Sequence, residues 1–162
     1  MAIFTTPHPK SCSQVIDQEG YAQPWQCAEA PRCVITFPGE GAHTFDMDTI
    51  DSLKMSPIWA DVDTAAPHVF GHELEPFLTN HLGEHAAPTS PLVTTIINIL
   101  NADRWRAAGH APHFVFGHSI GEVAAGYAAT LVSLADALAT AHLLGQIGAC
   151  CTGARRSRRW RT

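Results

Sequence analysis

The sequence predicts an α/β fold in which helices flank a short parallel sheet. Two short runs, at residues 33–37 and 113–116, are apolar and rich in β-branched or aromatic side chains, as buried strands are. A glycine-containing turn follows each run, and helical patterns lie between the two runs and after the second. Because strands that alternate with helices return to the same end of a sheet, we expect these strands to pair in parallel.

The elements before the second strand are marked mainly by proline. Residues 1–31 contain four prolines and little periodicity, which predicts an irregular leader. Beyond the first strand, weak helical patterns at residues 48–55 and 73–82 are broken by Pro57 and Pro67.

The later helices have clearer start signals. Thr89-Ser90-Pro91 combines a hydroxyl cap with a proline in the first turn. This helix is expected to bury one face, formed by Leu92, Ile96, Ile99 and Leu100. A helix at residues 121–129 follows the second strand, and Ser133 is expected to cap a last helix that runs to about Gly145.

The motif that carries chemistry is Gly117-His118-Ser119-Ile120-Gly121, a G-x-S-x-G pentapeptide between the second strand and its helix. A tight glycine turn at such a junction lifts a serine hydroxyl out of the sheet edge, the geometry of a nucleophile elbow. The following helix directs its N-terminal amides toward the serine, where they can bind an oxyanion. We interpret Ser119 as a nucleophile, and the alternative is a structural Gly-Ser turn.

The hexapeptide at residues 117–122 resembles the active-site signature of malonyl-CoA:acyl carrier protein transacylases and of the acyltransferase domains of polyketide and fatty-acid synthases. Residues 34–42 are similar to the first strand and glycine loop of that family. Thr89-Ser90-Pro91 stands where the family has Thr-Gln-Pro, and residues 132–138 resemble the segment after the serine-bearing helix. The resemblance implies a hydrolase-like large subdomain, of which this chain holds the N-terminal part without the ferredoxin-like subdomain.

The resemblance implies a role for several residues. Ser119 corresponds to the nucleophile and His118 to a neighbour that lines the pocket. The backbone N–H groups of Ile120 and Glu40 correspond to the two oxyanion donors, although Glu40 replaces a glutamine. A main-chain donor survives that change, but the carboxylate places a negative charge near the oxyanion.

Two pocket positions depart from the family pattern. Ser90 replaces a glutamine, and Leu144 replaces an arginine that holds the carboxylate of a malonyl group. Leucine cannot make that charge-assisted contact, so an active chain is expected to prefer an uncharged acyl group. Alternatively, Leu144 marks relaxed selection on an inactive copy.

The base that activates the serine in the family lies far downstream of the elbow. Here the only histidine after Ser119 is His142, which matches no catalytic position. Three interpretations therefore stay open: an acyltransferase fragment, a catalytically inactive truncated remnant, and a serine esterase. The loop at residues 37–41 argues against the esterase, since lipases usually build this donor from a His-Gly-Gly stretch.

The distribution of charge along the sequence indicates how the chain is divided. The chain has a formal net charge of −5, and five of its ten basic residues lie at 155–161. We therefore divide it into the leader, a partial acyltransferase domain at 32–149, and a basic tail at 150–162 that is either an out-of-frame end or a nucleic-acid or membrane arm. We prefer the interpretation as an out-of-frame end, so neither nucleic acid nor a membrane is expected as a partner. We read no run of about 18 apolar residues in the sequence, so no membrane span is expected.

The cysteines and histidines suggest neither a disulfide framework nor a metal site. Five cysteines at irregular spacing indicate reduced thiols, and hence a cytoplasmic location. No bound cofactor is expected. The resemblance implies acyl-CoA as substrate, and as partner an acyl carrier protein with its phosphopantetheine arm or the neighbouring domains of a synthase.

Overall fold

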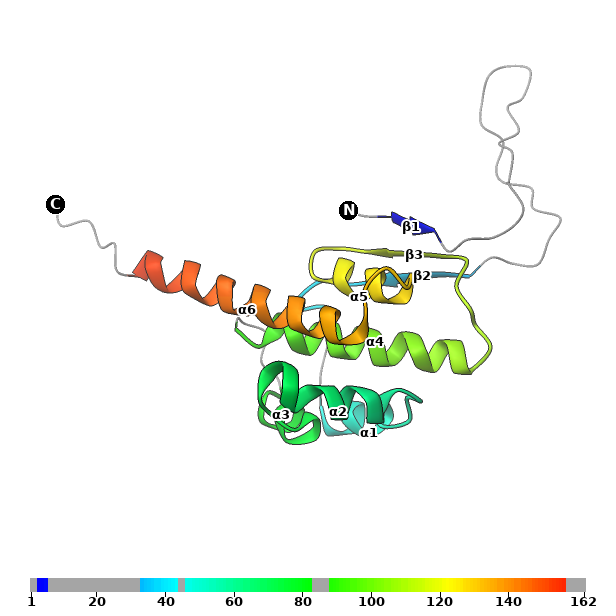
Figure 1. Ribbon diagram of the computed structural model, residues 1–162, viewed down its shortest axis with the longest axis horizontal. Coiled ribbons are helices and arrows are strands. Elements are labelled where there is room, and N and C mark those ends of the chain that lie inside the picture. The colour runs from blue at the N-terminus through cyan, green and yellow to red at the C-terminus, as the bar shows by residue number, and fades with distance from the viewer. Residues whose placement is uncertain (1–2, 6–32, 44–45, 83–87, 157–162) are drawn as a thin grey trace, which may run out of the picture.

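A computed structural model describes residues 3–5, 33–43, 46–82 and 88–156 (Figure 1). The predicted α/β class is confirmed. In chain order the elements are β1 (Ile3–Thr5), β2 (Val34–Phe37), α1 (Met47–Leu53), α2 (Trp59–Phe70), α3 (Leu74–Asn80), α4 (Ser90–Ala107), β3 (Phe114–Gly117), α5 (Gly121–Ala128) and α6 (Leu134–Arg156).

The described strands form a three-stranded sheet in the order β1-β3-β2. Strand β2 pairs with β3 in parallel, as the sequence predicts, and Phe37 lies opposite Gly117 at the carboxyl ends of the two strands. Strand β1 pairs with β3 in the antiparallel direction. The prediction of an irregular leader is therefore wrong for residues 3–5, while residues 6–32 lie outside the described part of the chain.

The elements stack in three layers, with the sheet on one side, α4, α5 and α6 in the middle, and α1, α2 and α3 on the far side (Figure 1). Phe37 and Val115 of the sheet pack on Ile99 of α4 and on a run of alanines in α5. Small side chains let α5 lie close to the strands. The carboxyl ends of β2 and β3 are thus placed beside the first turn of α5.

Helix α4 is the central helix of the fold. It begins at Ser90 with Pro91 in its first turn, as predicted, but the Thr89 side chain makes no capping hydrogen bond. Every residue from Ser90 to Leu100 is buried. The expectation of a single buried face is therefore wrong, because α4 is covered by the sheet and α5 on one side and by the helical layer on the other.

Helix α2 shows how packing overrides a local signal. The sequence predicts a break at Pro67, yet α2 runs from Trp59 to Phe70 with Pro67 inside it. Val62, Ala66 and Phe70 recur every four residues on its buried face, which anchors the helix on the core on both sides of the proline. Helix α2 ends only at Gly71, whose φ of 81° lies in the left-handed region.

The start of α6 was predicted correctly and its end was not. Ser133 Oγ accepts a hydrogen bond from the Asp136 N–H at 3.1 Å and donates to Asp136 Oδ2 at 2.7 Å. The helix then continues through Gly145, and through the tail boundary predicted at residue 150, to Arg156. Gly145 is therefore not a helix end. A glycine is needed there because α6 contacts the segment before α4, and a Cβ would lie 1.9 Å from the Pro88 carbonyl oxygen.

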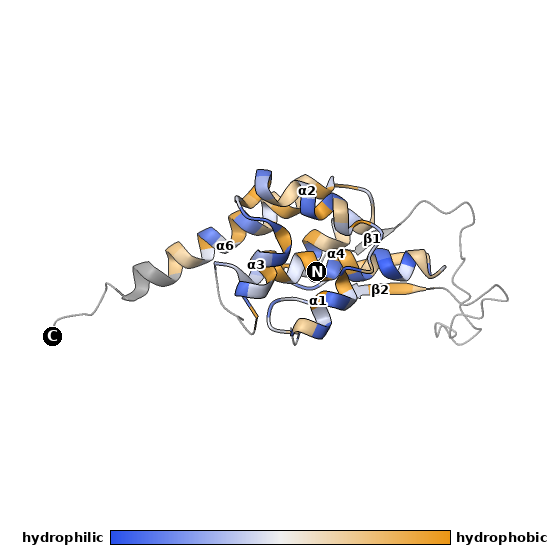
Figure 2. Ribbon diagram, turned by 90° about the horizontal axis from the view of Figure 1, so that it is seen from below, coloured by the Kyte–Doolittle hydropathy of each residue, from blue (hydrophilic) through white to orange (hydrophobic). Residues whose placement is uncertain are grey.

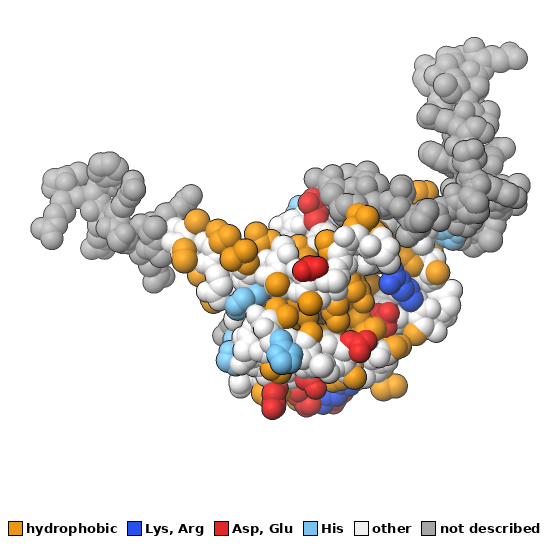
Figure 3. Space-filling view, viewed as in Figure 1, with side chains coloured by type: hydrophobic (Ala, Val, Ile, Leu, Met, Phe, Trp, Pro, Cys, Tyr) orange, Lys and Arg blue, Asp and Glu red, His pale blue; other side chains and the backbone are white. Residues whose placement is uncertain are grey.

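The outer part of α6 extends beyond the body of the molecule, and apolar residues continue along it (Figure 2). Figure 3 shows apolar side chains on the surface of this part of the helix. The large exposed ones on α6 are Leu143, Leu144 and Ile147. The window Leu134–Cys151 is long and apolar enough to cross a membrane, with a mean hydropathy of 1.2, which corrects the expectation that the chain has no such run. Ala137, Leu138 and Ala141 are buried, but only 22% of this window is buried in all.

Candidate active site

Ser119 lies at the junction between β3 and α5, as the motif predicts. Strand β3 ends at Gly117 and α5 begins at Gly121. Ser119 is exposed and has a φ of 55°, in the left-handed region that costs a residue with a β-carbon about 1 kcal/mol or more. Behind it, the N–H of Gly121 donates to His118 O at 3.0 Å and the N–H of Glu122 to Ser119 O at 3.0 Å. This geometry is a nucleophile elbow.

The two glycines of the motif are required by close contacts between backbones. A Cβ at Gly117 would lie 2.3 Å from the backbone nitrogen of Glu122. A Cβ at Gly121 would lie 2.2 Å from the carbonyl oxygen of Phe37, at the end of the neighbouring strand. The first glycine lets the turn close, and the second lets α5 approach β2.

The loop after β2 reaches the elbow. The N–H of His118 donates to Phe37 O at 3.0 Å, which carries the contact between the two strands one residue past Gly117. A Cβ at Gly39 would lie 3.1 Å from both the Ser119 Cβ and the His118 carbonyl oxygen. Glu40 follows directly, so the two glycine loops meet at one edge of the sheet, as the sequence predicts.

Ile120 and Glu40 present main-chain N–H groups that have no acceptor within the described part of the chain. The Ile120 side chain is only 7% exposed and packs into the core, which holds its backbone in place. The Glu40 side chain is exposed, where water screens its charge. Two unpaired amides beside a serine at an elbow have the chemistry of an oxyanion site.

Two further residues at this edge, Asn98 and His43, were not predicted from the sequence. Asn98 of α4 is 4% exposed, and its Nδ2 donates to the Pro38 carbonyl oxygen at 3.1 Å. Its Oδ1 lies 2.9 Å from Nε2 of His43. The available signal was a lone amide in the apolar stretch of α4 between Ile96 and Leu100, since a buried polar group needs a partner.

Ser90 and Leu144 lie at the contact between α4 and α6. Ser90 is 3% exposed in the first turn of α4, about 12 Å along the helix from Asn98 at a rise of about 1.5 Å per residue. Leu144 is 44% exposed, and its neighbour Gly145 packs on Pro88 just before Ser90. The structure thus brings these two segments together.

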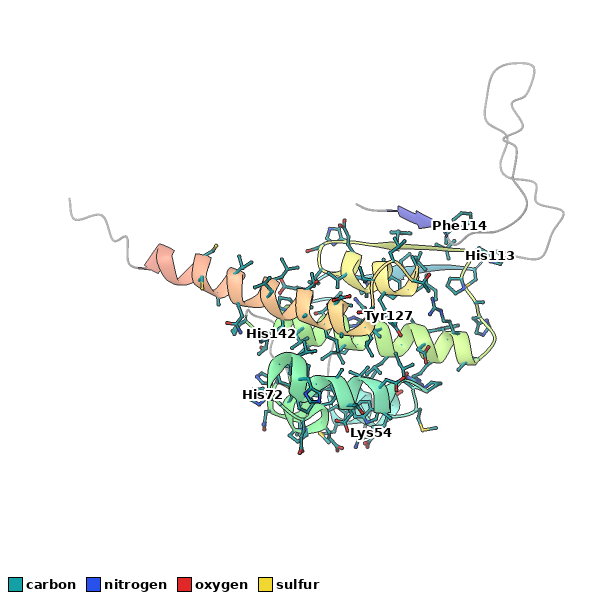
Figure 4. All side chains as sticks on the ribbon, in the orientation of Figure 1. Lys54, His72, His113, Phe114, Tyr127 and His142 are labelled. Atoms are coloured by element: carbon teal, nitrogen blue, oxygen red, sulfur yellow. The ribbon has the colours of Figure 1, made fainter. Side chains whose placement is uncertain are left out.

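No described histidine is hydrogen-bonded to the Ser119 side chain. The ring of His142 lies 6.4 Å from that of Phe70 in α2, and His113 sits at the start of β3, the end away from the elbow (Figure 4). His113 Nδ1 accepts the Cys33 N–H at 3.1 Å. His118 is next to Ser119 in the chain and is exposed. Over the same described residues, no group of three potential ligands could hold a metal ion.

Comparison with known proteins identifies the family of this chain. Residues 48–158, more than half of the chain, match the family model of the acyl transferase domain. The non-reducing polyketide synthase Dhc5 of Alternaria cinerariae is 36% identical over 112 residues, which are 65% of this chain and 5% of that protein. The reducing polyketide synthase PKS2 of Cochliobolus heterostrophus is 32% identical over 136 residues, 76% of this chain and 6% of that protein. The chain therefore spans about a twentieth of these relatives.

Two solved structures share the fold. An acyl-carrier-protein S-malonyltransferase from Burkholderia pseudomallei superposes with a TM-score of 0.60 at 21% identity, over 72% of this chain and 38% of that one. The malonyl-CoA:ACP transacylase of Synechocystis superposes with a TM-score of 0.58 at 23% identity, over 72% and 40%. The elbow lies within the matched residues, while the 38–43 loop precedes them and is assigned by its contacts with the elbow. The chain belongs to the acyl transferase domain family found in polyketide synthases.

Proposed function

We propose that Ser119 receives an acyl group from an acyl-CoA thioester and passes it to the phosphopantetheine thiol of an acyl carrier protein. The observation that carries the proposal is the exposed Ser119 in a left-handed conformation, at the junction with the N–H groups of Ile120 and Glu40, which have no acceptor among the described residues. Membership of the acyl transferase domain family supports the reaction class. Carrier proteins or neighbouring synthase domains are the partners that this class implies.

The chemistry divides into two similar halves. The Ser119 Oγ attacks the thioester carbonyl carbon, and the carbonyl oxygen becomes an oxyanion that the Ile120 and Glu40 N–H groups stabilise. The tetrahedral intermediate then collapses, the carbon–sulfur bond breaks, and coenzyme A leaves as a thiol with the proton that the serine lost. In the second half the carrier thiol attacks the serine ester and the ester carbon–oxygen bond breaks. The acyl group remains on the carrier as a thioester, and the thiol's proton returns to the Ser119 oxygen.

The activation of Ser119 needs a base that the described histidines do not supply, since none of them hydrogen-bonds to the serine. Serine is a poor nucleophile at neutral pH without such a base. We therefore propose that the 162-residue chain alone is acylated slowly. Its rate should rise steadily with pH and show no plateau above about pH 8, where a histidine base with an ordinary pKa of about 6.5 would be almost fully deprotonated.

The test is covalent loading of the purified chain with labelled hexanoyl-CoA, followed by intact mass measurement and peptide mapping. We expect one acyl group on Ser119 and none in Ser119→Ala. Neutral hydroxylamine separates a serine ester, which survives, from a thioester on any of the five cysteines, which does not. A label that stays in Ser119→Ala, or that maps to another residue, would overturn the proposal. A rapid rate with a plateau near neutral pH would show that a histidine does act as base.

A cytoplasmic location of the protein stays a prediction.

A further inference from the structure

One side chain of α4 contacts two points of the loop that follows β2. Asn98 Nδ2 donates to the carbonyl oxygen of Pro38 at 3.1 Å, and Asn98 Oδ1 lies 2.9 Å from His43 Nε2. Pro38 and His43 flank Gly39 and Glu40 in the stretch of this loop that the structure describes after β2, here called the 38–43 loop. Because the amide nitrogen donates to Pro38, the amide oxygen is an acceptor, and His43 Nε2 must carry the proton between them.

The clamp is anchored in the interior. Asn98 is 4% exposed, so water does not replace its partners and both hydrogen bonds hold the loop against a rigid helix. The Pro38 carbonyl oxygen is confined on its other side by α5, since a Cβ at Gly121 would lie 2.6 Å from it. The orientation of this carbonyl, set between α4 and α5, determines the direction of the peptide groups that follow.

We propose that Asn98 and His43 are positioning residues that keep the Glu40 N–H aimed at the oxyanion, an inference that rests on the proposed function. A donor stabilises an oxyanion only at about 2.7–3.1 Å. Gly39 and Gly41, the latter at a φ of 76°, give the 38–43 loop many alternative conformations once the clamp is released. Asn98 thus acts through the loop and touches no reacting atom.

The discriminating variant is Asn98→Asp. A carboxylate still accepts from His43 but cannot donate to Pro38, so it breaks one half of the clamp with little change in shape. His43→Ala breaks the other half at a half-buried loop position, where folding is not at risk, and His43→Gln restores a donor. Asn101→Asp is the matched control, three residues along the same helix, where the side-chain oxygen accepts from Arg104 and a carboxylate can do the same.

Two measurements are made on the full chain: amide hydrogen exchange of the peptide that contains residues 38–43, and the rate of Ser119 acylation at saturating hexanoyl-CoA. Asn98→Asp should exchange faster in that peptide and lose about 10- to 100-fold in the saturated rate, because it weakens one oxyanion donor. The half-saturating concentration should change by less than about threefold, since the effect is on the transition state. His43→Ala should show both effects more weakly, and His43→Gln should reverse them in part.

The two proposals fail in different ways. If the unmutated chain shows no acylation of Ser119, the proposed function is wrong, while hydrogen exchange still decides whether the clamp holds the loop. If Asn98→Asp does not fold, His43→Ala and His43→Gln carry the test. Unchanged exchange and unchanged rate in the folded variants would overturn the inference. An equal loss in Asn101→Asp would overturn it as well, because the effect would then come from α4 in general.

Discussion

Gly121→Ala tests whether the elbow depends on the close approach of α5 to the end of β2. The added Cβ would lie 2.2 Å from the Phe37 carbonyl oxygen, where contacts below 3.0 Å are essentially never seen. The two backbones must therefore separate by close to an ångström, although the same carbonyl is held by the His118 N–H at 3.0 Å. Forced backbone shifts of this kind cost about 1–3 kcal/mol.

The same substitution five residues later on α5 should have the opposite effect. A Cβ at Gly126 would meet only Val132 Cγ2, at 3.6 Å, which is an ordinary contact. Alanine is favoured over glycine in a helix interior by about 0.5–1 kcal/mol, so Gly126→Ala should stabilise the chain.

Urea unfolding of the two variants and the unmutated chain is the assay. We expect the urea midpoint of Gly121→Ala to fall by about 1 M. This shift is a loss of about 2 kcal/mol in the free energy of unfolding divided by a denaturant slope of about 2 kcal/mol per molar urea. Gly126→Ala should have a midpoint at or above that of the unmutated chain. Equal stability of Gly121→Ala and the unmutated chain, or an equal loss in both variants, would refute the steric argument.

The remaining predictions concern two helix caps and one pocket position. Ser133→Ala removes the cap of α6 and should lower the free energy of unfolding by about 1 kcal/mol in the same urea assay; no change would mean that the cap is dispensable. Hydrogen bonds from the side chain and the N–H of Thr49 lower the pKa of Asp46 from 3.8. The folded chain therefore binds fewer protons there than the unfolded chain, and this contribution is present above about pH 4 and is lost as the pH falls through the lowered pKa. Asp46→Ala should thus destabilise the chain at pH 6 and make less difference at pH 2.5, and an equal effect at both values would contradict the cap. Leu144→Arg should raise malonyl loading relative to hexanoyl loading of Ser119 by about fivefold, a modest gain because Leu144 is 44% exposed and water weakens the new ion pair. An unchanged ratio would remove Leu144 from the substrate pocket.

Features set by local geometry could be predicted from the sequence. The elbow at Ser119 follows from glycines on both sides of a serine at a strand–helix junction, because a turn this tight leaves few other arrangements. The meeting of the two glycine loops follows from parallel pairing, which places both strand ends at one edge. The start of α6 follows in the same way from Ser133 and Asp136.

Features set by distant contacts could not be predicted. Pro67 breaks a helix by its own chemistry, but the buried face of α2 continues past it. Gly145 resembles a helix end, and only the approach of Pro88 shows why a glycine stands there. Asn98 and His43 are 55 residues apart, and no local pattern joins them. The pairing of β1 with β3 spans more than a hundred residues and depends on the assembled sheet.

The backbone of Ser119 sets stability and chemistry against each other. At a φ of 55°, glycine has a lower backbone energy than a residue with a β-carbon. Ser119→Gly should therefore raise the free energy of unfolding by about 1 kcal/mol while it removes the hydroxyl. Thr130, at a φ of 61° after α5, offers the same relief without any expected effect on the elbow. If Ser119→Gly is more stable than the unmutated chain, the fold alone does not account for a β-carbon at residue 119. The strain there would then be a thermodynamic mark of a hydroxyl held in place for a reaction.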